Sequence, residues 1–314
     1  MSAFHVAAGT WRTCAAALAL LAGLFMAAHA NAAATWTAQK AKSGDFPPRI
    51  VAENRSAAPS RIPAMLTASA RGCSGIARAW YSEPTSRYRH GALGDTIEGG
   101  ALTARLAGGR TTVLKLPESE VFEDIAPRIV DLDGDGKCEI ITILSSLGAG
   151  GSIVVFGLEG TKLVRKATGA RQNRPHRWLN IAGIARYAAS HGSPQIAYVA
   201  TPHIGGTLGL LRYSGGRLTL LGSASGFSNH AFGSQELRLA ASADVDGDGR
   251  LELALPSTDR RALRIMDFGG GNPREIARIE LAGVIDKAIA VRGAGADTAF
   301  VVGLEDGSAW RIAR

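Results

Sequence analysis

A chain of 314 residues with 46% hydrophobic and 20% charged residues is long enough to bury a large core, and this composition excludes a largely disordered protein. The 39 glycines and the aromatic content of only 6% favour many short strands joined by tight turns over a helical body. The net charge of +8 is spread over single basic residues rather than basic runs, so we expect no nucleic-acid partner.

The N-terminal residues have the pattern of a secretory signal peptide. Arg12 precedes an apolar run of 15 residues, 14–28, which is shorter than the ~20 residues of a typical membrane span. Small residues follow at Ala28-His29-Ala30 and at Ala30-Asn31-Ala32, and either triplet fits a cleavage site. We therefore predict a signal peptide over residues 1–32, no transmembrane span after its removal, and a periplasmic or secreted protein. A retained anchor is the less favoured alternative.

Two cysteines, Cys73 and Cys138, follow the predicted signal peptide. The expected compartment is oxidising, so the two can form a disulfide. The alternative is a pair of buried free thiols, because the sequence does not show whether their Cα atoms lie close enough to be bridged.

Two acidic segments of nine residues are the most distinctive feature of the chain. Asp131 to Glu139 reads Asp-Leu-Asp-Gly-Asp-Gly-Lys-Cys-Glu, and Asp244 to Glu252 reads Asp-Val-Asp-Gly-Asp-Gly-Arg-Leu-Glu. Carboxylates at positions 1, 3, 5 and 9, with glycines at 4 and 6, are what a hard cation such as Ca²⁺ needs. An EF-hand is excluded because its ligating glutamate falls at position 12, where these segments have Thr142 and Leu255. A surface turn rich in Asp and Gly is the alternative.

Each acidic segment lies within the same order of short apolar runs, which predicts strand, acidic loop and three further strands. A middle copy keeps this order without the carboxylates: its loop runs from Tyr187 to Gln195, with Gly192 and Gln195 where the first loop has Gly136 and Glu139. Tyr187 follows Asp131 by 56 residues and precedes Asp244 by 57, so the repeat has a constant period. The expected strands of the three copies are 125–130, 140–144, 152–156 and 162–166, then 180–186, 196–200, 207–213 and 217–221, then 237–243, 251–255, 262–268 and 275–281.

The same period extends outward in both directions. A unit at 75–116 precedes the first acidic loop, and three strands at 287–291, 298–302 and 309–313 follow the last complete copy. Because an unpaired sheet edge is a liability, we expect Pro48 to Ala52 to supply the missing fourth strand. The prediction is an all-β protein, a β-propeller of five four-stranded blades closed by an N-terminal strand. Residues 33–74 form the N-terminal segment with that strand, and residues 75–314 form the propeller.

This pattern of acidic loops inside four-stranded repeats resembles the FG-GAP or VCBS repeats of integrin-alpha-like β-propellers, over roughly residues 75–314. Members of that family bind Ca²⁺ at the loop between the first two strands of a blade, and most are extracellular or periplasmic binding modules. The resemblance implies two structural calcium ions, because three of the five units lack the acidic pattern. The implied ligands are Asp131, Asp133, Asp135, the carbonyl of Lys137 and Glu139, and Asp244, Asp246, Asp248, the carbonyl of Arg250 and Glu252.

A candidate ligand site lies on the face that a propeller would present opposite the acidic loops. Loops there carry His176, Arg177, Trp178, His203, Asn229 and His230. Arginine pairs with carboxylate or phosphate and tryptophan stacks on rings, so the set suits an anionic or sugar-like ligand. The alternative is that Trp178 and the histidines only close the blade junctions by hydrogen bonding. Histidines could also hold a transition metal.

Two classes of function stay open. The first is a monomeric, non-enzymatic binding or scaffold module of the cell envelope, whose partner is an anionic or carbohydrate ligand or an envelope protein. The second is an envelope hydrolase or lyase acting on an anionic carbohydrate. Ser228 and His230 form a tempting pair, but Ser228 lacks the strand-to-helix turn that activates a serine. The candidate face offers only Glu236 and Asp259 as carboxylates, so we favour binding and assign no catalytic residue.

Overall fold

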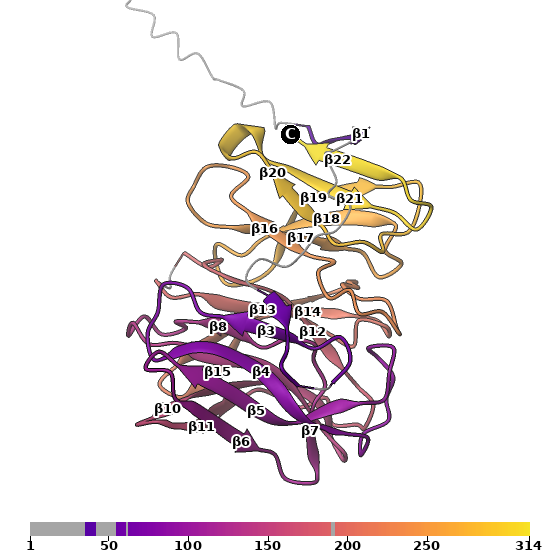
Figure 1. The fold of residues 1–314 in the computed structure, drawn as a ribbon. Helices are drawn as coiled ribbons and strands as arrows, with labels where there is room; N and C mark the ends of the chain where they lie inside the picture. The colour runs from indigo at the N-terminus through magenta and orange to yellow at the C-terminus, as the bar shows by residue number, and fades with distance from the viewer. Residues whose placement is uncertain (1–34, 42–54, 61, 190–191) are drawn as a thin grey trace, which may run out of the picture. The chain divides into compact units, whose positions relative to one another are not determined.

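The computed structural model describes residues 35–41, 55–60, 62–189 and 192–314. Figure 1 shows this part of the chain as β-strands, with one short 3₁₀ helix at Gly295–Asp297. The all-β prediction is therefore confirmed. The expected signal peptide and the segment Pro48 to Ala52 lie outside the described residues. Within the described ranges, no helix has the length and apolar character needed to cross a membrane.

Two four-stranded antiparallel sheets follow the chain in simple order and match two of the predicted repeat units. Short turns join their second, third and fourth strands, and a longer loop joins the first strand to the second in each. One sheet has the order β12 (Leu179–Ala185), β13 (Gln195–Ala200), β14 (Thr207–Ser214) and β15 (Arg217–Ser225). The other has the order β16 (Ala241–Ala243), β17 (Glu252–Pro256), β18 (Ala262–Asp267) and β19 (Arg274–Glu280).

A ten-stranded sheet replaces the two separate sheets that the sequence predicts upstream. The short strand β7 (Glu120–Phe122) pairs with β5 on one side and with β9 on the other, and so joins the two units. The sheet also begins before residue 75, because β3 pairs with β4. Its remaining strands are β2 (Arg55–Ala57), β3 (Leu66–Ser69), β4 (Ile76–Thr85), β5 (Glu98–Leu106), β6 (Thr111–Lys115), β8 (Arg128–Val130), β9 (Glu139–Ser146), β10 (Gly150–Glu159) and β11 (Lys162–Thr168).

The last sheet combines the two ends of the described chain. Its order is β1 (Thr37–Lys40), β22 (Ala309–Ala313), β21 (Ala299–Gly303) and β20 (Ala290–Arg292), as Figure 1 shows beside the C-terminus. The N-terminal segment thus does provide the fourth strand of the last unit. That strand is Thr37–Lys40, which lies upstream of the segment that the sequence suggested for the role.

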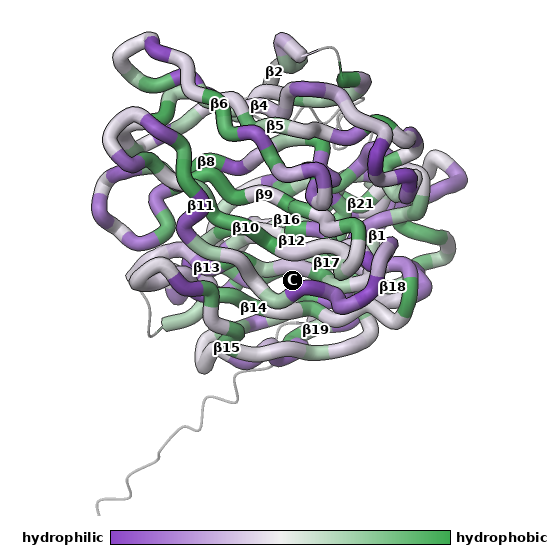
Figure 2. The backbone as a smooth tube through the Cα atoms, turned by 90° about the horizontal axis from the view of Figure 1, so that it is seen from below, coloured by the Kyte–Doolittle hydropathy of each residue, from purple (hydrophilic) through white to green (hydrophobic). Residues whose placement is uncertain are grey.

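Apolar side chains fill the space between sheets that follow one another in the chain. One buried cluster joins β9 and β10 to β13, with Ile141, Val155 and Ile196, and another joins β18 to β21, with Ile265 and Phe300. Figure 2 shows hydrophobic stretches along the strands and hydrophilic residues concentrated in the outer turns. Central strands such as β9 and β17 are buried along their whole length, whereas outer strands such as β11 combine exposed and buried side chains.

Cys73 and Cys138 form a disulfide, with their Cα atoms 5.2 Å apart. The alternative of two free thiols is thus excluded. The bridge attaches the segment before β4 to the first acidic loop, and backbone bonds reinforce it: Ser74 N donates to the Gly136 carbonyl at 2.9 Å, and Cys138 N donates to the Ser74 carbonyl at 2.9 Å. The first acidic loop is therefore held from outside its own repeat unit.

Candidate functional site

The two acidic loops lie where the sequence places them, between β8 and β9 and between β16 and β17. They share one backbone conformation. In the first loop the Asp131 carboxylate accepts hydrogen bonds from the fourth and sixth residues at 2.7 and 2.9 Å, and Asp244 does the same in the second at 2.6 and 3.0 Å. The glycines at these positions have φ of 82–83°, which a side chain would strain (Gly134, Gly136, Gly247 and Gly249).

In each acidic loop the side chain of the ninth residue accepts a hydrogen bond from the backbone of the second. The loop of the middle repeat copy, Tyr187 to Gln195, makes the same contact. A side-chain oxygen at position 9 accepts the backbone N–H of position 2 in all three loops. The bonds run from Leu132 to Glu139 at 2.8 Å, from Val245 to Glu252 at 2.9 Å and from Ala188 to Gln195 at 2.9 Å. A neutral glutamine suffices for this contact, so the repeat persists where the carboxylates are absent.

The acidic groups of each loop converge enough to hold a metal ion. One carboxylate oxygen from each of Asp131, Asp133 and Glu139 lies within 4.8 Å of the others. Burial, with smaller contributions from these aspartates and Asp135, raises the pKa of Glu139 to about 7. A divalent cation would offset both the burial of this carboxylate and its repulsion by the aspartates, so the loop fits such an ion.

The second loop converges on a different subset, namely Asp244, Asp246 and Asp248. Burial again raises the pKa of Glu252 to about 7. Of the four carboxylates expected in each loop, three come together in each. Asp135 in the first loop and Asp248 in the second each accept the backbone N–H two residues further on at 2.8 Å, so this bond does not decide which carboxylates converge.

The expected ligand face contains a pocket of about 250 Å³. Four of the six predicted residues line it, so the loops before β12 and between β13 and β14 do meet. Asn229 and His230 do not line it, because both side chains are buried behind it. The sequence did not identify His90 and the exposed Phe232 as part of the wall. The full lining is His90, His176, Arg177, Trp178, Thr201, His203, Ile204 and Phe232.

Trp178 makes a buried hydrogen bond and also lines the pocket. It is 1% exposed, and its Nε1–H donates to the Glu123 carbonyl at 2.9 Å, which ties β12 to the segment before β8. Its indole also stacks on the His203 ring, with the ring centres 5.9 Å apart and the planes 10° apart. The buried tryptophan therefore fixes one imidazole of the pocket wall.

His230 holds His203 in a single protonation pattern. His230 Nε2 lies 2.9 Å from the Ser234 carbonyl, which can only accept, so Nε2 carries the proton. His230 Nδ1 then accepts from His203 Nε2 at 2.8 Å. Burial lowers the pKa of His230 to about 3 and that of His203 to about 4, so both rings are neutral at pH 7.

The serine and histidine pair considered for a hydrolase does not form. The Ser228 hydroxyl donates to the backbone carbonyl of His230 at 3.3 Å rather than to its ring. Both ring nitrogens of His230 already have partners. The two carboxylates noted on this face are also occupied locally, since Glu236 pairs with Arg238 and Asp259 accepts from Ser257.

A buried carboxylate that the sequence did not place at the site orients His90. The Nδ1 atom of His90 lies 2.6 Å from Glu123 Oε1, while Glu123 Oε2 accepts a hydrogen bond from Ser145. Glu123 is fully buried, and the His90 ring stacks on His176 with centres 5.2 Å apart. An acidic pair at 123–124 flanked by apolar residues was the available signal, because carboxylates in apolar segments are rare unless they have partners.

Glu98 extends this buried acidic group on β5. It is 2% exposed, and burial, followed by the charges of Glu123, Asp95 and Asp124, raises its pKa to about 9. Burial and the charge of Glu123 also raise the pKa of Tyr88 to about 12. The region behind His90 therefore holds a carboxylic acid that stays protonated at neutral pH.

A scan against protein-family models finds no match to the sequence, and a search of curated proteins finds none. Among solved structures, the chain resembles rhamnogalacturonan lyase YesW, at 14% identity and a TM-score of 0.48, over 82% of this chain and 51% of that one. The Bacillus licheniformis rhamnogalacturonan lyase PL11 matches at 14% identity and a TM-score of 0.48, over 82% of this chain and 52% of that one. The exotype rhamnogalacturonan lyase YesX matches at 13% identity and a TM-score of 0.40, over 79% of this chain and 55% of that one. The chain spans about half the length of each lyase, and likeness at this level does not identify an activity.

Proposed function

We propose that the chain is a calcium-stabilised five-bladed β-propeller of the FG-GAP or VCBS type, located in the periplasm or outside the cell. The units β8–β11, β12–β15 and β16–β19 and the sheet of β20–β22 with β1 support this arrangement, because each repeats the same antiparallel order. The pairing of β1 with β22 joins the first described strand to the last, as closure of a ring requires. The two convergent carboxylate groups would hold the calcium ions.

We propose further that the protein is a non-enzymatic binding module whose ligand site is the histidine pocket. The observation that carries this is the convergence of Trp178, His203 and Arg177 in one pocket with Phe232. The neutral His203 imidazole and the aromatic faces suit a ring, and the guanidinium supplies a charge-assisted donor. A sugar or another cyclic compound bearing an acidic group combines both features.

The alternative is a hydrolase or lyase acting on an anionic carbohydrate, and one contact favours it. Glu123 holds Nδ1 of His90, while Nε2 of His90 has no hydrogen-bond partner within the described ranges. A histidine whose tautomer is fixed by a carboxylate in a pocket wall has the arrangement of a general base. In this version Glu123 would be a positioning residue and His90 the proton acceptor.

One experiment tests both versions. The mature protein is screened against acidic glycans and cyclic organic acids, and any compound that binds is titrated against Phe232→Ala, Arg177→Ala and the control Leu220→Ala. Leu220 is 51% exposed on β15 and does not line the pocket. We expect the two pocket variants to weaken binding about tenfold or more, which is ~1.4 kcal/mol, and the control to leave it unchanged.

A binding module returns the compound unaltered after prolonged incubation. Conversion of the compound by the wild type, and its loss in His90→Gln, would replace the binding proposal with the enzymatic one. Binding that is as tight in both pocket variants as in Leu220→Ala would place the site elsewhere.

A further inference from the structure

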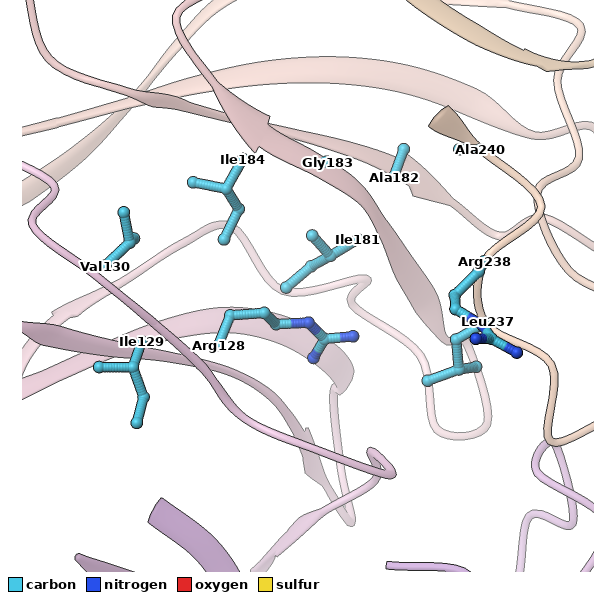
Figure 3. A pocket seen from close by; sticks show the side chains of 10 residues that line it. All are labelled: Arg128, Ile129, Val130, Ile181, Ala182, Gly183, Ile184, Leu237, Arg238 and Ala240. Atoms are coloured by element: carbon cyan, nitrogen blue, oxygen red, sulfur yellow. The ribbon is translucent and has the colours of Figure 1, made fainter. Parts of the chain in front are cut away.

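A second cavity, of about 380 Å³, lies between β8, β12 and the segment before β16. It shares no lining residue with the histidine pocket, so its binding chemistry is independent of the proposed function. Figure 3 shows the side chains around it. Its lining is Arg128, Ile129, Val130, Ile181, Ala182, Gly183, Ile184, Leu237, Arg238 and Ala240.

Among the described residues that line this cavity, the two arginines are the charged ones. Figure 3 shows the Arg128 side chain extending from β8 toward the side of the cavity where Arg238 and Leu237 lie. The side chains of Arg128 and Arg238 are 13% and 30% exposed, so both are only partly accessible to solvent. A cationic group in such a place has to be fixed by partners.

One carboxylate holds each guanidinium group in place. Arg128 Nη1 contacts the buried Asp124, which also accepts the Tyr81 hydroxyl at 2.7 Å. Arg238 Nε and Nη2 donate to the two oxygens of Glu236 at 2.7 and 2.6 Å. These bonds fix the orientation of both guanidinium groups and leave some of their N–H donors unused.

Three donor atoms remain, namely Nε and Nη2 of Arg128 and Nη1 of Arg238, and none has a hydrogen-bond acceptor in the part of the chain that the structure describes. None of the three is among the buried side-chain atoms that lack a partner, so each remains accessible to a ligand. A ligand that brings a hydrogen-bond acceptor would satisfy the remaining donors of both guanidinium groups at once. The rest of the wall is apolar, including Ile129 and Ile184, and suits a hydrocarbon body.

We infer that this cavity binds a small organic monocarboxylate, with its carboxylate between Arg128 and Arg238 and its apolar part against the isoleucines. Asp124 and Glu236 already balance the two arginines, so the lining attracts anions through directed donors rather than through excess positive charge. A dianion such as phosphate would meet repulsion from the same two carboxylates. A single negative charge is therefore favoured.

Calorimetric titration of the mature protein with octanoate tests the inference, with octanamide as the neutral analogue and inorganic phosphate as the dianion. The first variant is Arg238→Gln, because Arg238 is partly exposed and its loss leaves Arg128 and Asp124 paired. The second is Ile184→Phe, which fills the cavity without a change of charge. The control is Arg274→Gln, an equal change of charge at a side chain that is 70% exposed and does not line the cavity.

We expect octanoate to bind, octanamide and phosphate to bind at least about tenfold more weakly, and Arg238→Gln to weaken octanoate about tenfold or more. Ile184→Phe should abolish binding, and Arg274→Gln should leave it unchanged. The inference is overturned if octanoate does not bind or if the amide binds as tightly as the acid. It is equally overturned if phosphate binds more tightly, or if both cavity variants behave like Arg274→Gln.

Discussion

Neighbouring carboxyl groups in the buried region behind His90 have different surroundings. Asp124 Oδ2 contacts Arg128 and accepts the Tyr81 hydroxyl, so one of its two oxygens has charged and polar donors. Glu98 lies in the same region, but burial and the nearby carboxylates raise its pKa to about 9. The structure therefore combines a paired carboxylate with a neutral carboxylic acid, and the second has a measurable consequence for stability.

Glu98→Gln should remove a dependence of stability on pH. The pKa of Glu98 is about 9 in the folded protein and near the ordinary 4.5 in the unfolded chain, so the folded state binds more protons between these values. The free energy of unfolding therefore falls as pH rises through that window, by up to ~1.4 kcal/mol per unit. Glutamine stays neutral, so the variant should be more stable than the wild type at pH 8, by roughly 1 kcal/mol or more, and similar to it near pH 4.

Urea unfolding at pH 4, 6 and 8 measures this difference. The exposed Glu305→Gln serves as the control, since it removes one carboxylate from the surface. Parallel pH profiles for Glu98→Gln and the wild type would show that Glu98 is ionised in the folded protein at neutral pH.

The acidic loops were predictable from the sequence because their geometry is local. Glycines at fixed positions and a first-position aspartate that bonds to two of them determine the conformation within nine residues. The equivalence of Gln195 and Glu139 followed from the constant period and matches their common hydrogen bond. The strands around these loops were predictable for the same reason, since each forms a short apolar run between turns.

The parts that the sequence did not predict depend on distant contacts. Strand β7 has three residues, and its pairing with both β5 and β9 is decided by where those strands lie. His90 comes from the long connection between β4 and β5, and its partner Glu123 is 33 residues away. The strand that completes the last sheet lies upstream of the expected segment, and no local signal in Thr37–Lys40 shows that it pairs with β22. Periodicity predicts the repeat units and does not predict these tertiary pairings.

Calcium should stabilise the protein through the two acidic loops. Three carboxylate oxygens within 4.8 Å of one another repel without a cation, so an ion that binds only the folded loop raises the free energy of unfolding. At a hundredfold excess over its dissociation constant, one ion contributes ~2.7 kcal/mol, which corresponds to a rise of several degrees in Tm. Thermal unfolding in EGTA and in millimolar CaCl₂ measures the shift, which the double variant Asp133→Ala, Asp246→Ala should lack.

Asp306→Asn is the matched control, because Asp306 is an exposed aspartate in a turn outside both loops. It should keep the full calcium shift. A parent protein whose Tm does not respond to calcium would contradict the assignment of both loops.

At the scale of the whole molecule, the pairing of β1 with β22 connects residues that are separated by almost the entire described chain. Thr37 lies opposite Ala313, and the Trp36 ring stacks on Phe300 of β21 with centres 6.4 Å apart. The Arg314 guanidinium lies 5.5 Å from the centre of the same indole. Without β1, strand β22 would be an exposed edge, and the cluster around Phe300 would lose one side of its packing.

Trp36→Ala should therefore weaken the last sheet before the others. The indole is half-buried against Phe300, so its removal is expected to cost roughly 2 kcal/mol, below the 3–5 kcal/mol of a fully buried aromatic residue. The loss is local, so amide hydrogen exchange should accelerate in β20–β22 more than in β12–β15. The exposed Gln39→Ala on β1, the strand that follows Trp36, is the control and should change neither the Tm nor the exchange pattern. Equal acceleration in every sheet would mean that the chain unfolds as one unit, and no acceleration would mean that β1 contributes nothing to holding its two ends together.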